Sequence, residues 1–232
     1  MTSRQPKATD SFRGFSPLAL RFLRDLAKHN KREWFVPRKA TFEAELLAPL
    51  EALVSDATDA MRKAKIPFGG IPGRAPFRIY RDIRFSKDKS PYKTNLGAYL
   101  SPTDAHREPG GFYVHIQPGK SFMAVAFYAL DKPQLDRWRR TIAENPKRFE
   151  AMRKALERNG VKLSEEHVVL KRLPRGYEAF AASPIERFLR TGSFMVSEML
   201  SDKDVSSPRL IDKMVALAKK AKPLIDYGRA IG

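Results

Sequence analysis

Arginine and tyrosine side chains alternate along residues 78–84, and three lysines follow within the next nine residues. In an extended strand Arg78, Tyr80, Asp82 and Arg84 would share one face, because successive side chains point to opposite faces. An arginine fork can donate two parallel hydrogen bonds to a phosphate or carboxylate, and a tyrosine can donate another or stack on a base. The segment therefore predicts a site for an anion.

The candidate ligand-binding residues extend beyond this strand. Lys87, Lys89 and Lys93 would lie on a loop that could close over a ligand. His115 is a candidate proton carrier, and Asp82 is a candidate base or a carboxylate that positions an arginine. No cofactor is expected, and the histidines lack metal-ligand spacing, so no metal site is predicted. The predicted ligand-binding residues are Arg78, Tyr80, Arg81, Arg84, Lys87, Lys89, Tyr92, Lys93, Asn95, Tyr113 and His115.

Two other interpretations of the basic segment stay open. In the first it is a solvated sheet face whose Asp82 pairs with an arginine, because alternating strands commonly have polar outer faces. The protein would then be a structural or interaction module. In the second the whole basic surface binds nucleic acid, because lysines and arginines neutralise phosphates. The net charge of +18 supports this, and basic clusters recur at residues 137–140, 171–175 and 219–222.

Hydrophobic periodicity predicts the elements that would position these residues. Helical spacing of apolar residues predicts helices over about residues 17–29 and 37–61 and through most of the chain after residue 131. Residues 193–200 fit either a strand or a helical turn. Period-two alternation and short connections favour an antiparallel meander, with strands at residues 77–85, 94–100, 112–118 and 121–130. The order indicates an α+β fold, with a central, mainly antiparallel sheet over about residues 77–130 packed with N-terminal and C-terminal helices.

Composition bounds the class of protein. The chain has 232 residues, of which 42% are hydrophobic, which predicts one globular α+β domain over residues 12–232 after a flexible N-terminus over residues 1–11. The absence of cysteine excludes disulfides and thiolate chemistry and fits a reducing compartment. The longest apolar run, residues 122–130, is shorter than the roughly 20 residues that span a membrane. We therefore expect a cytoplasmic protein with an anionic small-molecule partner or nucleic acid and no membrane partner. The sequence does not predict an oligomeric state.

Several long motifs carry a resemblance to a known family. They are "FRGFSPLALRFLRDLAKHNKREWF", "RIYRDIRFSKDKSPYKTNLGA", "GGFYVHIQPGKSF", "KRLPRGY" and "KPLIDYG". Through these motifs the chain resembles the uncharacterised family called domain of unknown function 2461, and the resemblance runs from about Phe12 to the end of the chain. The resemblance implies one compact domain and a recurring Arg-Tyr-Arg-Asp segment, and it implies no reaction. The chain departs from it at "MAVAFYAL", where relatives often have glycines, and at Asn95, where a histidine is common.

Overall fold

The structure is a computed structural model that describes residues 11–84, 87–103 and 108–231. The chain folds into two compact units. Unit 1 comprises Met1–His106, Tyr113–Met123 and Glu198–Val215, and unit 2 comprises Arg107–Phe112, Ala124–Ser197 and Ala216–Gly232. Apart from Ser11, the predicted flexible N-terminus lies outside the described residues. The single domain expected over residues 12–232 stays a prediction.

Unit 1 begins with the helix that the sequence predicts at its start. In α1 (Pro17–Lys28), the Ser16 hydroxyl accepts a hydrogen bond from the Ala19 N–H at 3.0 Å, and Pro17 occupies the first helical turn. Serine and proline favour these positions because a serine oxygen satisfies a free N–H and proline has none to satisfy. The apolar stripe of α1 is buried in the core of unit 1.

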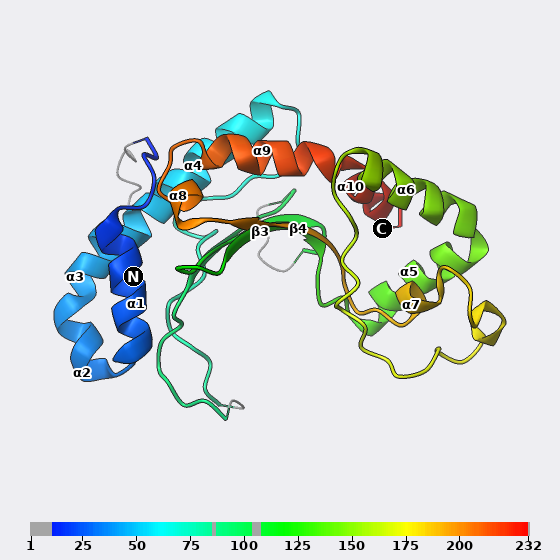
Figure 1. Cartoon of the computed structure of the whole chain (residues 1–232), viewed down its shortest axis with the longest axis horizontal. Coiled ribbons are helices and arrows are strands. Elements are labelled where there is room, and N and C mark those ends of the chain that lie inside the picture. Colours follow the sequence, from blue (N-terminus) through cyan, green and yellow to red (C-terminus); the bar gives the residue numbers. More distant parts are fainter. Residues whose placement is uncertain (1–10, 85–86, 104–107, 232) are drawn as a thin grey trace. The chain divides into compact units, whose positions relative to one another are not determined.

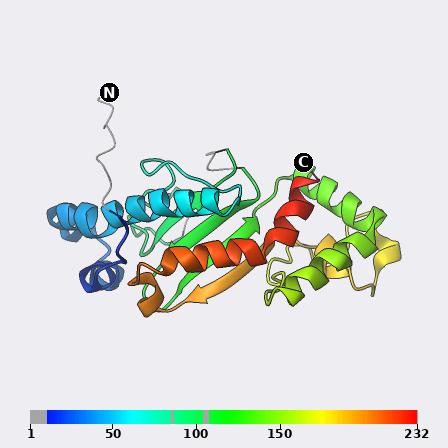
Figure 2. The same cartoon turned by 90° about the horizontal axis from the view of Figure 1, so that it is seen from above.

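A long helical run follows, drawn in blue to cyan in Figure 1. It consists of α2 (Arg32–Phe35), α3 (Lys39–Phe42) and α4 (Ala48–Lys63), joined by a 3₁₀ turn at Val36–Arg38 and a π turn at Glu43–Leu47. The run confirms the second predicted helix and begins a few residues before it. Figure 2 shows α4 running across the strands, and α4 packs against β1 (Leu96–Leu100).

The sheet has four antiparallel strands in the order β1-β2-β3-β4. They are β1, β2 (Gly111–Ile116), β3 (Ser121–Phe127) and β4 (Phe194–Leu200), so residues 193–200 form a strand and not a helical turn. The α+β fold class is confirmed. Leu96 and Ala98 of β1 and Val114 and Ile116 of β2 are buried. Because side chains alternate along a strand, Tyr113 and His115 project from the opposite face.

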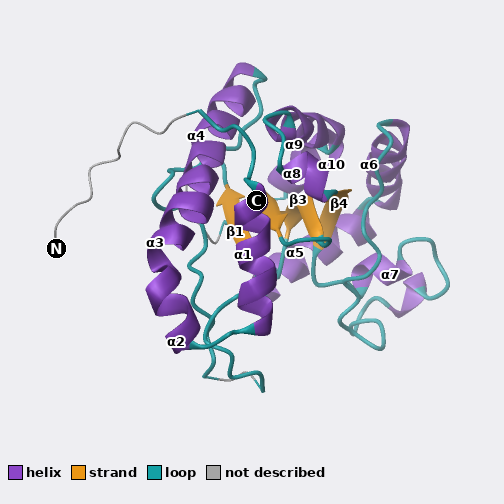
Figure 3. Cartoon of the chain, turned by 60° about the vertical axis from the view of Figure 1, so that its left-hand side comes forward, coloured by secondary structure: helices purple, strands orange, loops and turns teal. Residues whose placement is uncertain are grey.

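The predicted strand over residues 77–85 is wrong as a regular strand. Between α4 and β1 the described chain is drawn as loop (Figure 3). It forms isolated antiparallel bridges, Pro76 with Ala98 and Tyr80 with Tyr92. Residues 85 and 86 lie outside the described residues. Alternation alone could not separate a strand from an extended segment that pairs only at intervals.

Unit 2 contains most of the remaining helices. They are α5 (Lys132–Glu144), α6 (Pro146–Arg158), α7 (Glu186–Leu189) and α10 (Lys222–Arg229), with a 3₁₀ turn at Glu178–Phe180. Within this unit α10 packs on α6, and α5 contacts α6 and α7. Trp138 stacks on Phe194 with ring centroids 4.0 Å apart. A Cβ at Gly228 would lie 2.1 Å from the Phe127 ring, so this close approach needs glycine.

Two further helices, α8 (Asp202–Val205) and α9 (Leu210–Lys220), lie in the chain between β4 and α10. α8 begins at a capping box in which the Ser201 and Asp204 side chains each accept a hydrogen bond from the other residue's N–H. Among the described residues, no helix is long and apolar enough to cross a membrane.

Candidate functional site

Residues 75–84 and 87–99 form an irregular hairpin in unit 1, and most predicted site residues lie on it. We call residues 75–80 and 91–95 the hairpin base and residues 81–84 and 87–90 the hairpin tip. The Phe77 N–H donates to the Gly97 carbonyl at 2.8 Å, and the Lys93 N–H donates to the Ile79 carbonyl at 2.7 Å. Between these bonds one residue on the first arm faces three on the second, so the second arm bulges. Bulges redirect side chains, and here Asn95 is turned towards His115.

Tyr92 anchors the hairpin base in the core. Its side chain is 3% exposed and stacks on Phe35 with ring centroids 4.1 Å apart. The Asn30 side chain donates to the Tyr92 carbonyl at 2.9 Å and accepts from the Tyr92 N–H at 3.0 Å. Burial raises the pKa of the Tyr92 hydroxyl, and the neighbouring Tyr80 raises it further. These contacts give this predicted ligand-binding residue an anchoring role.

At the hairpin tip the arginines are paired with carboxylates of the same hairpin. Arg81 pairs with Asp88. Arg84 donates to both oxygens of Asp82, at 3.0 and 2.7 Å. The side-chain hydrogen bond from Arg84 lowers the pKa of Asp82 to about 2, so this carboxylate is ionised at neutral pH and is a poor general base. The interpretation in which Asp82 pairs with an arginine therefore describes the tip.

The two lysines of the tip have different surroundings. Lys89 donates to the Ile83 carbonyl at 3.0 Å, which closes the loop on itself. Lys87 is exposed. Neither lysine approaches the sheet face through any contact among the described residues.

At the hairpin base two cations lie close together without a carboxylate. Within the described part of the chain neither Arg78 nor Lys93 forms an ion pair. Burial lowers the pKa of the Lys93 ammonium, and the positive charge of Arg78 lowers it further. The Lys93 Nζ atom lies 5.5 Å from the centre of the Phe77 ring, whose electron-rich face attracts a cation. Among the described residues, the positive charge of the base thus has no carboxylate partner.

On the sheet face, His115 is held in place by its neighbours. The Tyr113 hydroxyl lies 3.0 Å from His115 Nδ1, and Gln117 Oε1 lies 3.1 Å from His115 Nε2. The Asn95 amide is 3.4 Å from Nδ1. Phe122 stacks on the imidazole with centroids 4.8 Å apart. Burial lowers the pKa of His115, and the hydrogen bond to Gln117 opposes this, so neutral His115 is favoured.

These contacts select one tautomer of His115. A carbonyl oxygen can only accept, so Nε2 carries the proton and donates to Gln117 Oε1, which leaves Nδ1 as an acceptor. The Tyr113 hydroxyl then donates to Nδ1. Both ring nitrogens are occupied by protein groups, so His115 orients Tyr113 and must break a hydrogen bond before it can exchange a proton with a ligand.

Gly97 on β1 makes room for Tyr113. A Cβ at this position would lie 2.6 Å from the Tyr113 hydroxyl oxygen and 2.9 Å from its ring. The tyrosine therefore lies across β1 and reaches Phe77, with ring centroids 5.9 Å apart. This contact joins the His115 cluster to the hairpin base.

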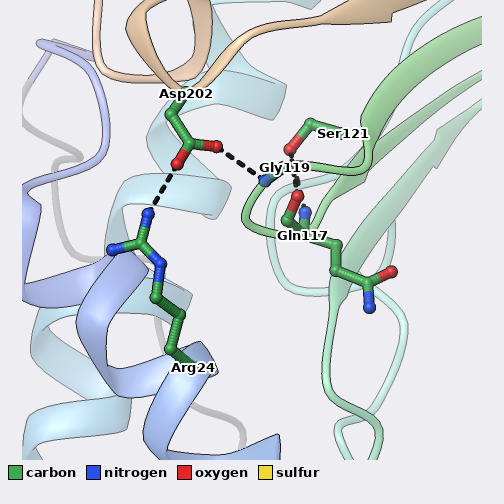
Figure 4. A network of polar contacts seen from close by, with 5 residues as sticks. All are labelled: Arg24, Gln117, Gly119, Ser121 and Asp202. Atoms are coloured by element: carbon green, nitrogen blue, oxygen red, sulfur yellow. Dashed lines mark hydrogen bonds and ion pairs between the residues drawn. The ribbon is translucent and has the colours of Figure 1, made fainter.

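The turn between β2 and β3 fixes the end of the same sheet face (Figure 4). The Ser121 hydroxyl donates to the Gln117 carbonyl at 2.9 Å and accepts from the Gln117 N–H at 2.9 Å. Asp202 accepts from the Gly119 N–H at 2.8 Å and from Arg24 at 2.6 Å. The turn is therefore tied to α8 and α1, which holds Gln117 and so His115.

The structure brings some predicted site residues together and leaves others apart. Asn95 and Tyr113 contact His115 on the sheet face, and Lys93 is linked to Tyr113 through Phe77. Arg78 acts on Lys93 through its charge. Tyr80 is 56% exposed and contacts the buried Tyr92. The tip residues Arg81, Arg84, Lys87 and Lys89 contact none of the His115 cluster among the described residues. The sequence analysis missed Phe77, Gln117 and Phe122, although alternation places Gln117 on the His115 face.

The described residues offer no group of three or more histidine, aspartate or glutamate side chains that could hold a metal ion. What the arrangement offers is a pair of cations, a tyrosine hydroxyl, an amide and aromatic rings. Such groups bind and orient an anion.

The fold defines an α+β protein with a four-stranded antiparallel sheet. The chain belongs to the family of conserved hypothetical proteins DUF2461, which it matches over residues 18–227, and this confirms the resemblance seen in the sequence motifs. No curated protein matches the chain.

Among solved structures, the chain is similar to an uncharacterised protein from Methanothermobacter thermautotrophicus. The two share 14% identity and a TM-score of 0.35, and the similarity covers 74% of this chain and 94% of the other. At this level the similarity supports no argument about function.

Proposed function

We propose that the protein binds a small anionic ligand, bearing phosphate or carboxylate, at the hairpin base. Arg78 and Lys93 supply the charge, and Asn95, Tyr113 and His115 orient the ligand. The observation that carries the proposal is the pair of adjacent cations that have no carboxylate partner among the described residues. Like charges held together destabilise a protein unless something compensates them.

The contrast within one hairpin strengthens the proposal. The tip arginines form ion pairs with carboxylates of the same hairpin. A bound anion at the base would neutralise Arg78 and Lys93 in the same way. Because burial makes the Lys93 charge unfavourable, a bound anion gains more there than at a fully solvated lysine.

The groups around His115 determine which ligand groups fit the site. Asn95 Nδ2 lies 3.4 Å from His115 Nδ1, and the Asn95 Oδ1 oxygen can accept a hydrogen bond from a ligand hydroxyl or amine. A ligand with an anionic group and a donor next to it fits this arrangement better than a bare anion.

A thermal-shift screen of the purified protein tests the proposal. The probes are inorganic phosphate, sugar phosphates, nucleotides and dicarboxylates, each at low and moderate salt. A ligand that binds the native state raises Tm with the logarithm of its concentration. We expect at least one probe to raise Tm, and Lys93→Ala to weaken its binding by about tenfold or more, as loss of a charge-assisted hydrogen bond does.

Lys89→Ala is the matched control, because it removes a lysine from the same hairpin that contacts only a backbone carbonyl. An equal loss of binding in both variants would contradict the proposal. If only oligonucleotides raise Tm, and the effect falls log-linearly with salt, the nucleic-acid alternative replaces it.

A further inference from the structure

Unit 1 contains a second feature, a groove beside the first arm of the hairpin. Its volume is about 1450 Å³, which is larger than the roughly 300–1,000 Å³ of small-molecule sites. One wall is residues 71–74 and 76–80, the other is one side of the helical run from α3 to the start of α4, and residues 11–14 also line it. Lys93, Asn95, Tyr113 and His115 do not line it, so the groove is distinct from the proposed anion site, although the two share Phe77 and Arg78 of the hairpin base.

The wall at residues 76–80 has a free backbone edge. Ala75, Phe77, Ile79 and Arg81 direct their main-chain hydrogen bonds to the second arm of the hairpin. Successive residues of an extended chain direct their N–H and C=O groups to opposite sides. Among the described residues the N–H and C=O groups of Arg78 and Tyr80 accordingly have no hydrogen-bond partner. Such an edge is a template for another strand.

The helical wall of the groove has small side chains, which leave room for the backbone of a bound peptide. Ala40, Ala44 and Ala48 line the groove at four-residue spacing, which places them on one helix face, and all three are exposed. Apolar side chains at both walls, among them Leu47, Ile71 and Phe77, can receive the side chains of a ligand. Ile71 and Phe77 are 41% and 39% exposed.

The charge of the groove selects the chemistry of its partner. Four cations and the two carboxylates of Glu43 and Glu51 line it, so positive charge is in excess. In the described part of the chain only Lys39 among the cations has an ion pair, with Glu43 at 3.7 Å. Arg13, Arg74 and Arg78 have none. An extended segment that carries carboxylates would satisfy both the free edge and these arginines.

We propose that the groove binds an extended acidic peptide segment of a partner protein, which adds to the edge at Arg78 and Tyr80 as a further strand. Strand addition supplies main-chain hydrogen bonds, and pockets for alternate side chains supply specificity. The arginines favour acidic residues, and the apolar wall favours β-branched or aromatic residues between them. The inference does not rest on the proposed anion site.

Selection from a displayed library of random peptides of about eight residues, a usual strand length, tests the inference. We expect the enriched peptides to alternate acidic and apolar residues. When the best peptide saturates the protein, amide hydrogen exchange at Arg78 and Tyr80 should slow by about tenfold or more, because both amides gain partners. Phe77 and Arg81, which already donate within the hairpin, should change little.

Ala44→Trp fills the groove from an exposed helical position and should weaken peptide binding by about tenfold or more, as loss of an interface anchor does. Ala151→Trp is the control, because Ala151 is also an exposed helical alanine and lies outside the groove. Arg74→Glu, at an exposed residue, tests the charge preference without filling the groove.

Any of several outcomes would overturn the inference. The library could yield no enriched sequence, Ala44→Trp could bind the peptide as tightly as wild type, or amide hydrogen exchange at Arg78 and Tyr80 could stay unchanged. Oligonucleotides that protect these amides in place of peptides would also overturn it. Loss of anion binding in Lys93→Ala with peptide binding retained would separate this groove from the anion site.

Discussion

The base and the tip of the hairpin contain the same residue types and use them differently. At the tip Arg81 and Arg84 pair with Asp88 and Asp82, and these contacts are solvent-exposed. At the base Lys93 is partly buried and Arg78 is exposed, and neither has a carboxylate partner among the described residues. The comparison teaches that a basic residue in a sequence is available to a ligand only where the fold gives it no carboxylate partner.

The base also differs from the tip in how firmly it is held. Tyr92 is buried against Phe35 and bonded twice to Asn30, whereas the tip is closed mainly by its own ion pairs and the Lys89 contact. Exposed ion pairs contribute little to stability. A binding site needs residues in fixed positions, and only the base provides them.

The largest expected effect is that of removing the anchor. Tyr92→Ala should lower the free energy of unfolding by about 3–5 kcal/mol, as truncation of a buried aromatic ring does. Urea unfolding measures it. Tyr92→Phe keeps the ring and should keep anion binding. If Tyr92→Phe instead abolishes anion binding while the protein stays stable, the Tyr92 hydroxyl contacts the ligand and Tyr92 is more than an anchor of the hairpin base.

The next effect concerns the pH dependence of stability at His115. Burial lowers its pKa in the folded state below the ordinary value of 6.5, so near that pH the unfolded chain binds more protons. The free energy of unfolding should therefore fall as pH drops from about 7 to 5, by at most about 1.4 kcal/mol per pH unit for one proton. Solvent around the half-buried ring reduces this.

His115→Gln removes this titration, so its unfolding free energy should fall less steeply over the same pH range. Urea unfolding of both proteins across that range measures the difference. The carboxylates are common to the two proteins and cancel. Equal pH dependence would show that His115 titrates as it does in the unfolded chain.

The smallest effect tests the charge at the base directly. Lys93→Met removes one of two like charges and should raise the free energy of unfolding, by roughly 0.2–1 kcal/mol for like charges in contact. Asp88→Asn at the tip should lower it slightly, since it removes a partner of Arg81. Chemical unfolding at low ionic strength measures both. A destabilised Lys93→Met would mean that Lys93 contributes to the fold through a favourable contact.

The sequence predicted the α+β class, the helix that starts at Ser16-Pro17, and most strands, because these follow from local periodicity and capping. It could not show that residues 77–84 are only intermittently paired. The alternation there comes from an extended arm whose pairing depends on a bulge in the opposite arm. It also left β4 open, since its partners lie far away in the chain.

For the candidate site, the sequence by itself determined the inventory of basic and aromatic residues and its concentration between residues 74 and 95. Only the tertiary structure decided which of them are neutralised. The carboxylates of Asp82 and Asp88 reach the tip arginines, while Asn95, Tyr113 and His115 come to the base through the bulge and the sheet. The physical reason is that charge is a property of a residue, whereas its compensation depends on the distance to another residue.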